Sequence, residues 1–353
     1  MPDPARQLGV DAVIATRNRA EALAVSVPLL LAQSYPLAKL IVIDSSDDHA
    51  PVAETLAAAT QNWSGEVIVE HSAPGLPRQR NLGLRHVTAD IVLFPDDDSL
   101  LHPGALEAIM EVYRRDRDGE VVGVAASEAF EPPSGALPED AWKPSTVHRR
   151  EAAWAPLRYR IDRRLQASNP FFVLGGALQK TPPSWLGAVR AVPVEYMTGF
   201  RMSFRTPAIK AIGFDETLTG HALGEDIEAS FAVATKGTLV GARNAMIYHH
   251  RFPGGRGDGF RQGAVSVLNR TYIVCKHLAQ SDLPRSRRAR VLSLLTQYFR
   301  LRGLSYLARS RQKEARAQLR GMRRAAPLAR RLRGLASEDL VPAYRAAMEE
   351  LGL

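Results

Sequence analysis

The sequence has little cysteine and no long apolar run. Its single cysteine, Cys275, excludes an internal disulfide framework and any metal site built from several cysteines. No run approaches the ~20 consecutive apolar residues that are needed to cross a bilayer. The segment Met1–Pro4 is acidic and interrupted by proline, unlike the basic start of a secretory signal. From these absences we expect a cytoplasmic protein.

Acidic residues are scarce in the C-terminal part of the chain. From Asp282 onward there are 17 Lys and Arg against 6 Asp and Glu, a net charge of +11, whereas residues 1–281 carry −2. Within residues 284–333 apolar side chains alternate with arginine, which predicts basic amphipathic helices. Such helices can lie on an anionic membrane surface, or they can pack on the rest of the protein with a solvated Arg face. No aromatic-rich RNA-binding motif accompanies the charge, so we expect no nucleic acid partner.

Short apolar runs alternate with helical segments in the first third of the sequence. The predicted strands are 10–15, 40–43, 66–70 and 90–94, and the predicted helices are 21–33, 50–60, a segment around Arg80, and 103–115. This alternation is typical of βαβ units and a parallel sheet. We predict an α/β domain over residues 1–280, with an irregular insertion at 131–183, and a basic helical region over 281–353.

Polar clusters follow three of the predicted strands, at 16–19, 44–48 and 96–98. The carboxyl ends of parallel strands meet at one edge of a sheet, where ligands bind. In the third cluster, Asp96-Asp97-Asp98, three consecutive carboxylates repel one another unless a cation such as Mg²⁺ lies between them. The alternative is a solvated acidic turn before a helix. Because three clusters share one edge, we favour a metal–diphosphate site.

These features, in this order, resemble family 2 of the glycosyltransferases, which have the GT-A nucleotide-sugar-binding fold. The resemblance covers about residues 8–275 and rests on the motifs 16–19, Asp44, Gly75 with 80–83, 96–98, 213–216, 224–226 and His249. It implies a Rossmann-like, mostly parallel sheet flanked by helices, with a C-terminal helical extension. Two departures are that the second strand ends Asp-Ser-Ser-Asp in place of Asp-Asp-Gly-Ser, and that the Q-x-x-R-W motif of processive synthases is missing.

The resemblance implies a metal-dependent, inverting hexosyl- or deoxyhexosyltransferase that uses a nucleoside-diphosphate sugar. The expected acceptor is a glycan or a lipid-linked glycan in cell-surface polysaccharide or glycolipid synthesis, which would place the protein at the inner face of the membrane. One alternative is a sugar-1-phosphate nucleotidyltransferase, although residues 16–19 lack the glycine that its phosphate loop needs. The other is a nucleotide-sugar-binding protein without turnover.

For the metal, Mg²⁺ or Mn²⁺, we expect Asp98 as a direct ligand and Asp96 facing the ribose, a metal-bound water or the ion itself. Asp97 would point the other way, because alternate side chains of an extended chain face opposite sides. His249 is the expected second protein ligand, since neutral imidazole commonly binds metals. His250 is the alternative, and either histidine could instead be a partly buried hydrogen-bonding residue.

At the acceptor side, Asp226 is the expected general base, within hydrogen-bond reach of the acceptor hydroxyl. Glu225 would hold the acceptor or orient Asp226. The alternative is that Glu225, Asp226 and Glu228 complement a helix N-terminus, where acidic groups gain ~0.3–1 kcal/mol. The family position of Asp226 favours catalysis.

At the nucleotide side, Asp44 suits hydrogen bonds to the base or the ribose, and Thr16 and Arg17 are expected to line the same pocket. An isolated arginine of this kind is otherwise a solvated surface charge.

For the diphosphate and the sugar we expect four further contacts. Arg80 would pair with the diphosphate, which favours bidentate guanidinium contacts, and Asn81 belongs to the same motif. Gly199 would allow the backbone to approach the sugar closely, or it is simply a turn residue. Arg256, in the glycine-rich loop 254–259, would close over the diphosphate.

Overall fold

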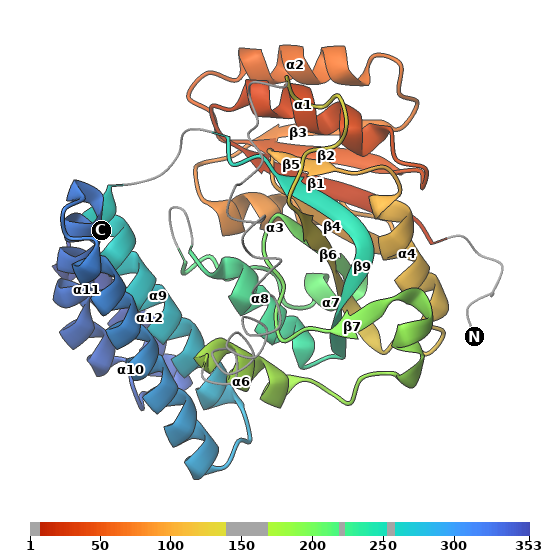
Figure 1. The fold of residues 1–353 in the computed structure, drawn as a ribbon. Helices are drawn as coiled ribbons and strands as arrows, with labels where there is room; N and C mark the ends of the chain where they lie inside the picture. Colours follow the sequence, from red (N-terminus) through yellow and green to blue (C-terminus); the bar gives the residue numbers. More distant parts are fainter. Residues whose placement is uncertain (1–7, 139–168, 219–222, 253–257) are drawn as a thin grey trace, which may run out of the picture.

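The computed structural model describes residues 8–138, 169–218, 223–252 and 258–353. Within these residues, nine strands form one mixed sheet with helices on both of its faces. The helices of the C-terminal region, drawn in blue, stand together at one side of this sheet (Figure 1). The chain is therefore an α/β protein with a C-terminal helical region, as the sequence predicts.

The N-terminal half of the sheet is parallel. It contains β1 (Val10–Thr16), β2 (Lys39–Asp44), β3 (Glu66–His71) and β4 (Ile91–Pro95) in the order β3-β2-β1-β4. Thr16 pairs with Asp44, and Asp44 pairs with His71, so the carboxyl ends of these strands are aligned. This register is what brings the polar clusters after the strands to one edge.

The other half of the sheet contains antiparallel pairs. β8 (Arg201–Arg205) lies antiparallel between β4 and β6 (Val121–Ala129), and β9 (Thr238–His249) runs parallel to β6. β5 (Ser99–Leu101) and β7 (Ala191–Pro193) pair antiparallel with β9. From the sequence, Ser99 was expected to precede a helix, and β5 was not predicted. A strand of three residues is too short to show the alternation of apolar and polar residues that identifies a strand. Its pairing aligns Ser99 with His249, across most of the domain.

Successive side chains of a strand point to opposite faces of the sheet, so the strands contribute to two separate cores. On one face, Ile14 and Val42 pack with α1 (Ala20–Leu31), α2 (Ala50–Thr60) and α4 (Ala105–Arg115). On the other face, Val13 and Ile41 pack with α3 (Leu76–His86), α7 (Thr206–Lys210) and α8 (Glu225–Ala234). Burial on both faces is the usual state of parallel strands.

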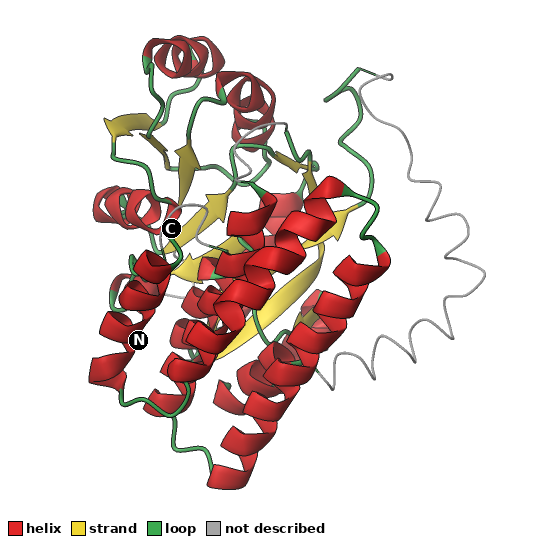
Figure 2. Ribbon diagram, turned by 90° about the vertical axis from the view of Figure 1, so that its left-hand side faces the viewer, coloured by secondary structure: helices red, strands yellow, loops and turns green. Residues whose placement is uncertain are grey.

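A third core joins the C-terminal helices to the sheet domain. It contains side chains of α9 (Gly259–Gln280), α10 (Arg285–Ala308), α11 (Lys313–Arg331) and α12 (Ser337–Glu350), together with the outer side of α8. Helix α9, which the predicted boundary at residue 280 leaves with the first domain, packs in this core. The long helices lie side by side in front of the strands (Figure 2). No helix among the described residues is both long enough and apolar enough to cross a bilayer.

Helices α9 and α11 approach each other at glycines. A Cβ on Gly321 would collide with the Phe260 carbonyl, and one on Gly263 would collide with the Gln318 carbonyl. Side chains larger than hydrogen would therefore separate the two helices at this crossing.

The segment 131–183 is not irregular throughout, which corrects the sequence-based expectation. Residues Pro170–Leu178 form helix α6, whose start is capped by Asn169: its Oδ1 accepts the Phe171 N–H at 3.0 Å. A 3-10 helix, η1 (Ser184–Val189), follows the segment. A nine-residue helix is too short to show a clear period in the sequence. Residues 139–168 of the predicted insertion lie outside the described residues.

Candidate active site

The three carboxylates after β4 have different surroundings. Asp97 and Asp98 are 3% and 2% exposed. Asp97 accepts hydrogen bonds from the Thr16 hydroxyl at 2.9 Å and from Arg19 Nη1 at 2.6 Å. Asp98 accepts from Arg19 Nη2 at 2.7 Å, and Asp96 is partly exposed and accepts from Arg80 Nη2 at 2.9 Å. Two buried, ion-paired carboxylates are not what a solvated acidic turn would show.

Asp96, Asp98 and His249 come together as a group that can hold a metal ion. Their ligand atoms all lie within 4.8 Å of one another. His249 Nε2 is 3.3 Å from Asp98 Oδ1, and its ring stacks on Phe200 with the ring centroids 4.5 Å apart. The Oδ1 atom of Asp98 is buried and lacks a well-formed hydrogen bond. Two carboxylates and an imidazole, with one acceptor atom unsatisfied, fit a divalent cation such as Mg²⁺ or Mn²⁺.

His250, the alternative ligand, meets the same aspartate through its backbone. Its N–H donates to the Asp98 carbonyl at 3.1 Å, and its ring lies 5.9 Å from the Phe252 ring. Burial lowers the pKa of His250, although Asp98 opposes this. His249, which is in register with Ser99 in the β5–β9 pair, is the histidine that belongs to the ligand group.

The three neighbouring carboxylates also differ in acidity. Burial opposes ionisation of Asp98, but His249 and Arg19 outweigh it and lower its pKa to about 2. Burial raises the pKa of Asp97 to about 7, although Arg19 favours its charged form. Burial also raises the pKa of Asp96, against the attraction of Arg80. Asp98 is therefore the carboxylate of the three that is best suited to a cation near neutral pH.

Arg19 is a site residue that the sequence reasoning missed. Besides its two carboxylates it donates to the Phe252 carbonyl at 2.8 Å and lies over the Phe252 ring. Arg17, expected in the pocket, is instead half-exposed and pairs with Asp47 at 3.2 Å. Between them, Asn18 adopts a left-handed conformation with φ of 53°, which turns the chain. Asn tolerates this conformation better than most residues, and that was the available signal.

Arg80 is buried and does not face open space. Its Nη2 atom donates to Asp96 at 2.9 Å and to the Gly199 carbonyl at 3.3 Å, and its Nη1 atom contacts Glu225. Its guanidinium also lies 5.5 Å above the Phe214 ring. We expected Arg80 to pair with a diphosphate. The structure corrects this expectation, because the Arg80 guanidinium is buried and already paired with the carboxylates of Asp96 and Glu225.

Two neighbouring side chains leave little room for a Cβ atom at Gly199. A Cβ there would lie 3.3 Å from Arg80 Nη2 and 3.4 Å from Glu225 Oε1, which is tighter than ordinary contact. Its N–H donates to Asp226 Oδ2 at 3.0 Å. The sequence suggested that Gly199 lets the backbone approach the sugar. In the structure, the groups that the Gly199 backbone approaches closely are the side chains of Arg80 and Glu225.

The two acidic residues that open α8 play different parts. Glu225 is 5% exposed and bound to Arg80, so it is not free to hold an acceptor. Burial and the charge of Asp226 raise the pKa of Glu225, and Arg80 opposes them. Asp226 is half-buried, and its Oδ1 accepts the Ile227 N–H at 2.8 Å. Each oxygen of Asp226 receives one backbone N–H, which leaves lone pairs for a further donor.

Asp44 is fully buried at the end of β2 and supports two histidines. Its oxygens accept from the Ser46 N–H and from His49 Nδ1, both at 2.8 Å, and Oδ2 lies 4.0 Å from His71 Nδ1. The two imidazole rings are 3.5 Å apart. Their side chains are 39% and 55% exposed, whereas Asp44 has no exposed surface. His49 and His71, which the sequence reasoning missed, are therefore the exposed residues of this corner, and they cover Asp44.

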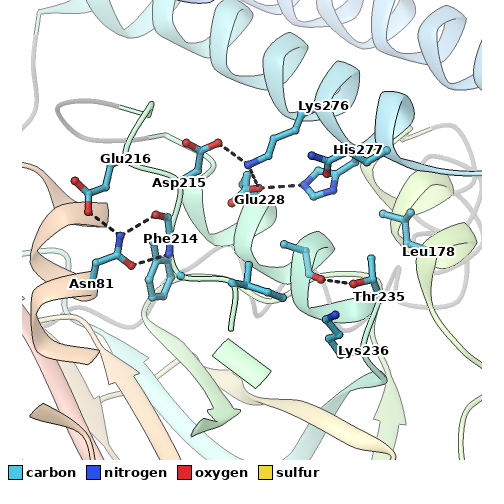
Figure 3. Close-up of a pocket in the computed structure, with 14 residues that line it drawn as sticks. Asn81, Leu178, Phe214, Asp215, Glu216, Glu228, Thr235, Lys236, Lys276 and His277 are labelled. Atoms are coloured by element: carbon cyan, nitrogen blue, oxygen red, sulfur yellow. Dashed lines mark hydrogen bonds and ion pairs between the residues drawn. The ribbon is translucent and has the colours of Figure 1, made fainter. Parts of the chain in front are cut away.

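Asn81 turns away from the sheet edge. Its Nδ2 donates to the Phe214 carbonyl and to Glu216, both at 2.9 Å, and its Oδ1 accepts the Phe214 N–H at 2.7 Å (Figure 3). The amide is thus occupied in holding the 213–216 turn and is not placed to bind a donor. Arg256 lies outside the described residues.

A cavity of about 580 Å³ lies beside this turn, between α3, α8 and α9. In its wall, Lys276 Nζ lies 2.6 Å from Asp215 and 2.7 Å from Glu228. Figure 3 draws both ion pairs as dashed lines. Its lining residues do not include the aspartates after β4 or His249. The cavity is therefore separate from the group of Asp96, Asp98 and His249. The ion pair between Glu228 and Lys276 in its wall connects α8 to α9.

Comparison with known families agrees with this geometry. Residues 11–181 match the model of glycosyl transferase family 2. This match identifies residues 11–181 as a segment of the glycosyl transferase family 2 type. The matched segment includes β1 to β6 and the Asp96–Asp98 cluster, whereas the α8 carboxylates and His249 lie beyond it.

Two solved structures share the fold of this family 2 domain. The mannosyltransferase PcManGT from Pyrobaculum calidifontis, in complex with GDP-Man and Mn²⁺, has a TM-score of 0.52 at 15% identity, over 99% of this chain and 82% of that chain. TarS 1–349 from S. aureus, in complex with UDP-GlcNAc, has a TM-score of 0.50 at 14% identity, over 98% and 92%. At these identities the likeness shows the GT-A fold. A comparison with curated protein sequences gives no significant match.

Proposed function

We propose that the protein is a metal-dependent, inverting glycosyltransferase that moves a hexose or deoxyhexose from a nucleoside-diphosphate sugar to an acceptor hydroxyl. The observation that carries the proposal is the meeting of Asp96, Asp98 and His249 at the carboxyl edge of a family 2 domain. Structures with the same fold contain GDP-Man with Mn²⁺ or UDP-GlcNAc. A divalent ion held by these three residues would act as a Lewis acid on the diphosphate oxygens.

Asp226 is the proposed general base. In a single displacement, the acceptor oxygen bonds to the anomeric carbon while the bond to the diphosphate breaks, and the hydroxyl proton passes to the carboxylate. The Gly199 N–H and the Ile227 N–H each hold one oxygen of Asp226, which fixes the orientation of the carboxylate. Glu225, buried against Arg80, acts behind it as a positioning residue.

For the nucleotide we propose contact through the imidazoles of His49 and His71. Asp44 binds the Nδ1 side of His49, which orients the ring and leaves its other edge for the ligand. Thr16 ends β1, which lies between β2 and β4, and its hydroxyl donates to Asp97, so it connects this corner to the Asp96–Asp98 cluster. The proposed acceptor is a glycan or a lipid-linked glycan of cell-surface polysaccharide or glycolipid synthesis, with the enzyme in the cytoplasm or at the inner membrane face.

The donor is found first, by thermal-shift measurements with a panel of nucleotide sugars and Mn²⁺, since ligands that bind the folded state raise its melting temperature. We expect one nucleotide class to raise Tm only when Mn²⁺ is present. Asp98→Asn and His249→Ala should abolish this Mn²⁺-dependent rise in Tm. A metal-independent shift that both variants retain would contradict the proposed metal group.

The base is tested by the Asp226→Asn variant. Asparagine keeps the hydrogen bond to a helix N-terminus, so a purely structural role predicts full activity. A general base predicts a ~10²–10⁴-fold loss of metal-dependent nucleoside diphosphate release, with donor binding retained. Unchanged turnover would remove Asp226 from the mechanism, and release of pyrophosphate from a nucleoside triphosphate would point to a nucleotidyltransferase instead.

A further inference from the structure

Three large apolar side chains are exposed in a row on helix α10. Leu301, Leu304 and Leu307 are 61%, 61% and 50% exposed. Their spacing of three residues places them on one side of the helix. The buried side of α10 is a different one, formed by Val291 and Leu295 among others. Single exposed leucines need no explanation, but a contiguous apolar row marks an interaction site.

The leucine row is surrounded by positive charge. Helix α10 contains six arginines and neither Asp nor Glu. Arg300 lies next to the row, and Arg309 and Arg311 follow the end of the helix; all three are exposed. In the part of the chain that the structure describes, Arg309 donates to Ser305 and lies over the Tyr306 ring, and none of these three arginines pairs with a carboxylate. The cationic charge is therefore available to a partner.

We propose that this face of α10, Leu301, Leu304 and Leu307 with Arg300, Arg309 and Arg311, docks on an anionic lipid surface. A lipid headgroup layer supplies phosphates for the arginines and hydrocarbon beneath them for the leucines. The proposal concerns elements other than the metal group and does not rest on the proposed transfer reaction.

Other partners match only half of this surface. Nucleic acid offers phosphates but would leave the three leucines in water. A second copy would cover the leucines but would bring together two C-terminal regions that each carry a net charge of +11. An anionic bilayer interface is the partner that satisfies both the charge and the apolar row.

The test is flotation of the full chain with vesicles of phosphatidylcholine alone or with phosphatidylglycerol added. We expect binding only to the anionic vesicles, weakening between low and high salt because exposed charges are screened. The triple variant Leu301→Gln, Leu304→Gln, Leu307→Gln should reduce the partition constant by about tenfold or more. Each of Arg300→Gln, Arg309→Gln and Arg311→Gln should reduce it by about fivefold.

The matched control is Ala57→Gln with Ala58→Gln, two exposed positions of α2, which lies at the far end of the sheet from α10 (Figure 1). This control should bind as the unchanged protein does, and circular dichroism should show every variant folded. Equal binding to neutral and anionic vesicles, or a leucine variant that binds like the control, would overturn the proposal. So would a concentration-dependent dimer that the leucine variant abolishes while vesicle binding is absent.

Discussion

Arginine is buried and ion-paired at the carboxyl edge of the sheet, whereas on helix α10 it is exposed to solvent. At the edge, Arg80 is 2% exposed and joins Asp96 to Glu225, which is 145 residues away in the chain. On α10, Arg300 faces solvent without a carboxylate partner among the described residues. A buried guanidinium fixes the geometry of its partners, and losing it leaves their charges unpaired. An exposed guanidinium contributes to a field whose strength depends on the number of charges and on salt.

The largest expected effect comes from breaking the buried pair. Arg80→Gln leaves Glu225 without its cation, and loss of one partner of a buried pair costs about 3–5 kcal/mol of unfolding free energy. The matched control is Arg78→Gln on the same helix, since Arg78 is 57% exposed and lies 3.7 Å from Glu216. This exposed pair should be worth less than about 1 kcal/mol. Urea unfolding of both variants measures the difference in their unfolding free energies. Equal free energies would mean that the ion pairs of Arg80 contribute no more to stability than an exposed ion pair does.

The next effect tests the packing of the helical region. Gly321→Ala places a methyl group against the Phe260 carbonyl, and overpacking of this kind costs about 1–3 kcal/mol. In Gly303→Ala on α10 the nearest atom to the new methyl is 3.9 Å away, in Leu319. That control should stabilise the helix by about 0.5–1 kcal/mol. Thermal unfolding should therefore move in opposite directions for the two variants, and a shared direction would contradict the described crossing.

The third effect depends on pH and separates two adjacent carboxylates. The pKa of Asp98 is lowered to about 2, so the stability it contributes is present above the unfolded pKa and lost as pH falls toward 2. For a buried group this shift corresponds to about 2 kcal/mol. The stability difference between the unchanged protein and Asp98→Asn should shrink accordingly from pH 5 to pH 2, as urea unfolding at several pH values would show.

Asp97 should behave with the opposite sign. Its pKa is raised to about 7, so the folded state binds the proton more tightly and loses stability as pH rises from about 4 to 7. Asp97→Asn should therefore gain stability relative to the unchanged protein across that range. Parallel pH profiles for the Asp97 and Asp98 variants would show that the two carboxylates share one environment.

Much of the fold was readable in the sequence, because its signals are local. The prediction of a helix over 50–60 matches α2 (Ala50–Thr60), and the predicted strands agree with β1 to β4 within about two residues. The antiparallel half was less readable: β5 is three residues long, and its partner β9 comes much later in the chain. Helix α6 was missed for the same reason of length.

The candidate site was readable in its residue types and less so in its contacts. Asp96, Asp98 and His249 were predicted together, and the structure brings them together. Arg19 was passed over in favour of Arg17, because only the left-handed turn at Asn18 decides which arginine faces the carboxylates.

By itself, the sequence determined the α/β alternation, the carboxylates that follow the strands, and the uneven charge of the two parts, because apolar period, turn residues and composition are properties of short segments. Only the tertiary structure decided that Arg80 is enclosed by Asp96 and Glu225, that Asp44 is hidden behind His49, and which leucines of α10 remain exposed. Those outcomes depend on which distant segments meet, and pairing across the whole chain leaves no local trace.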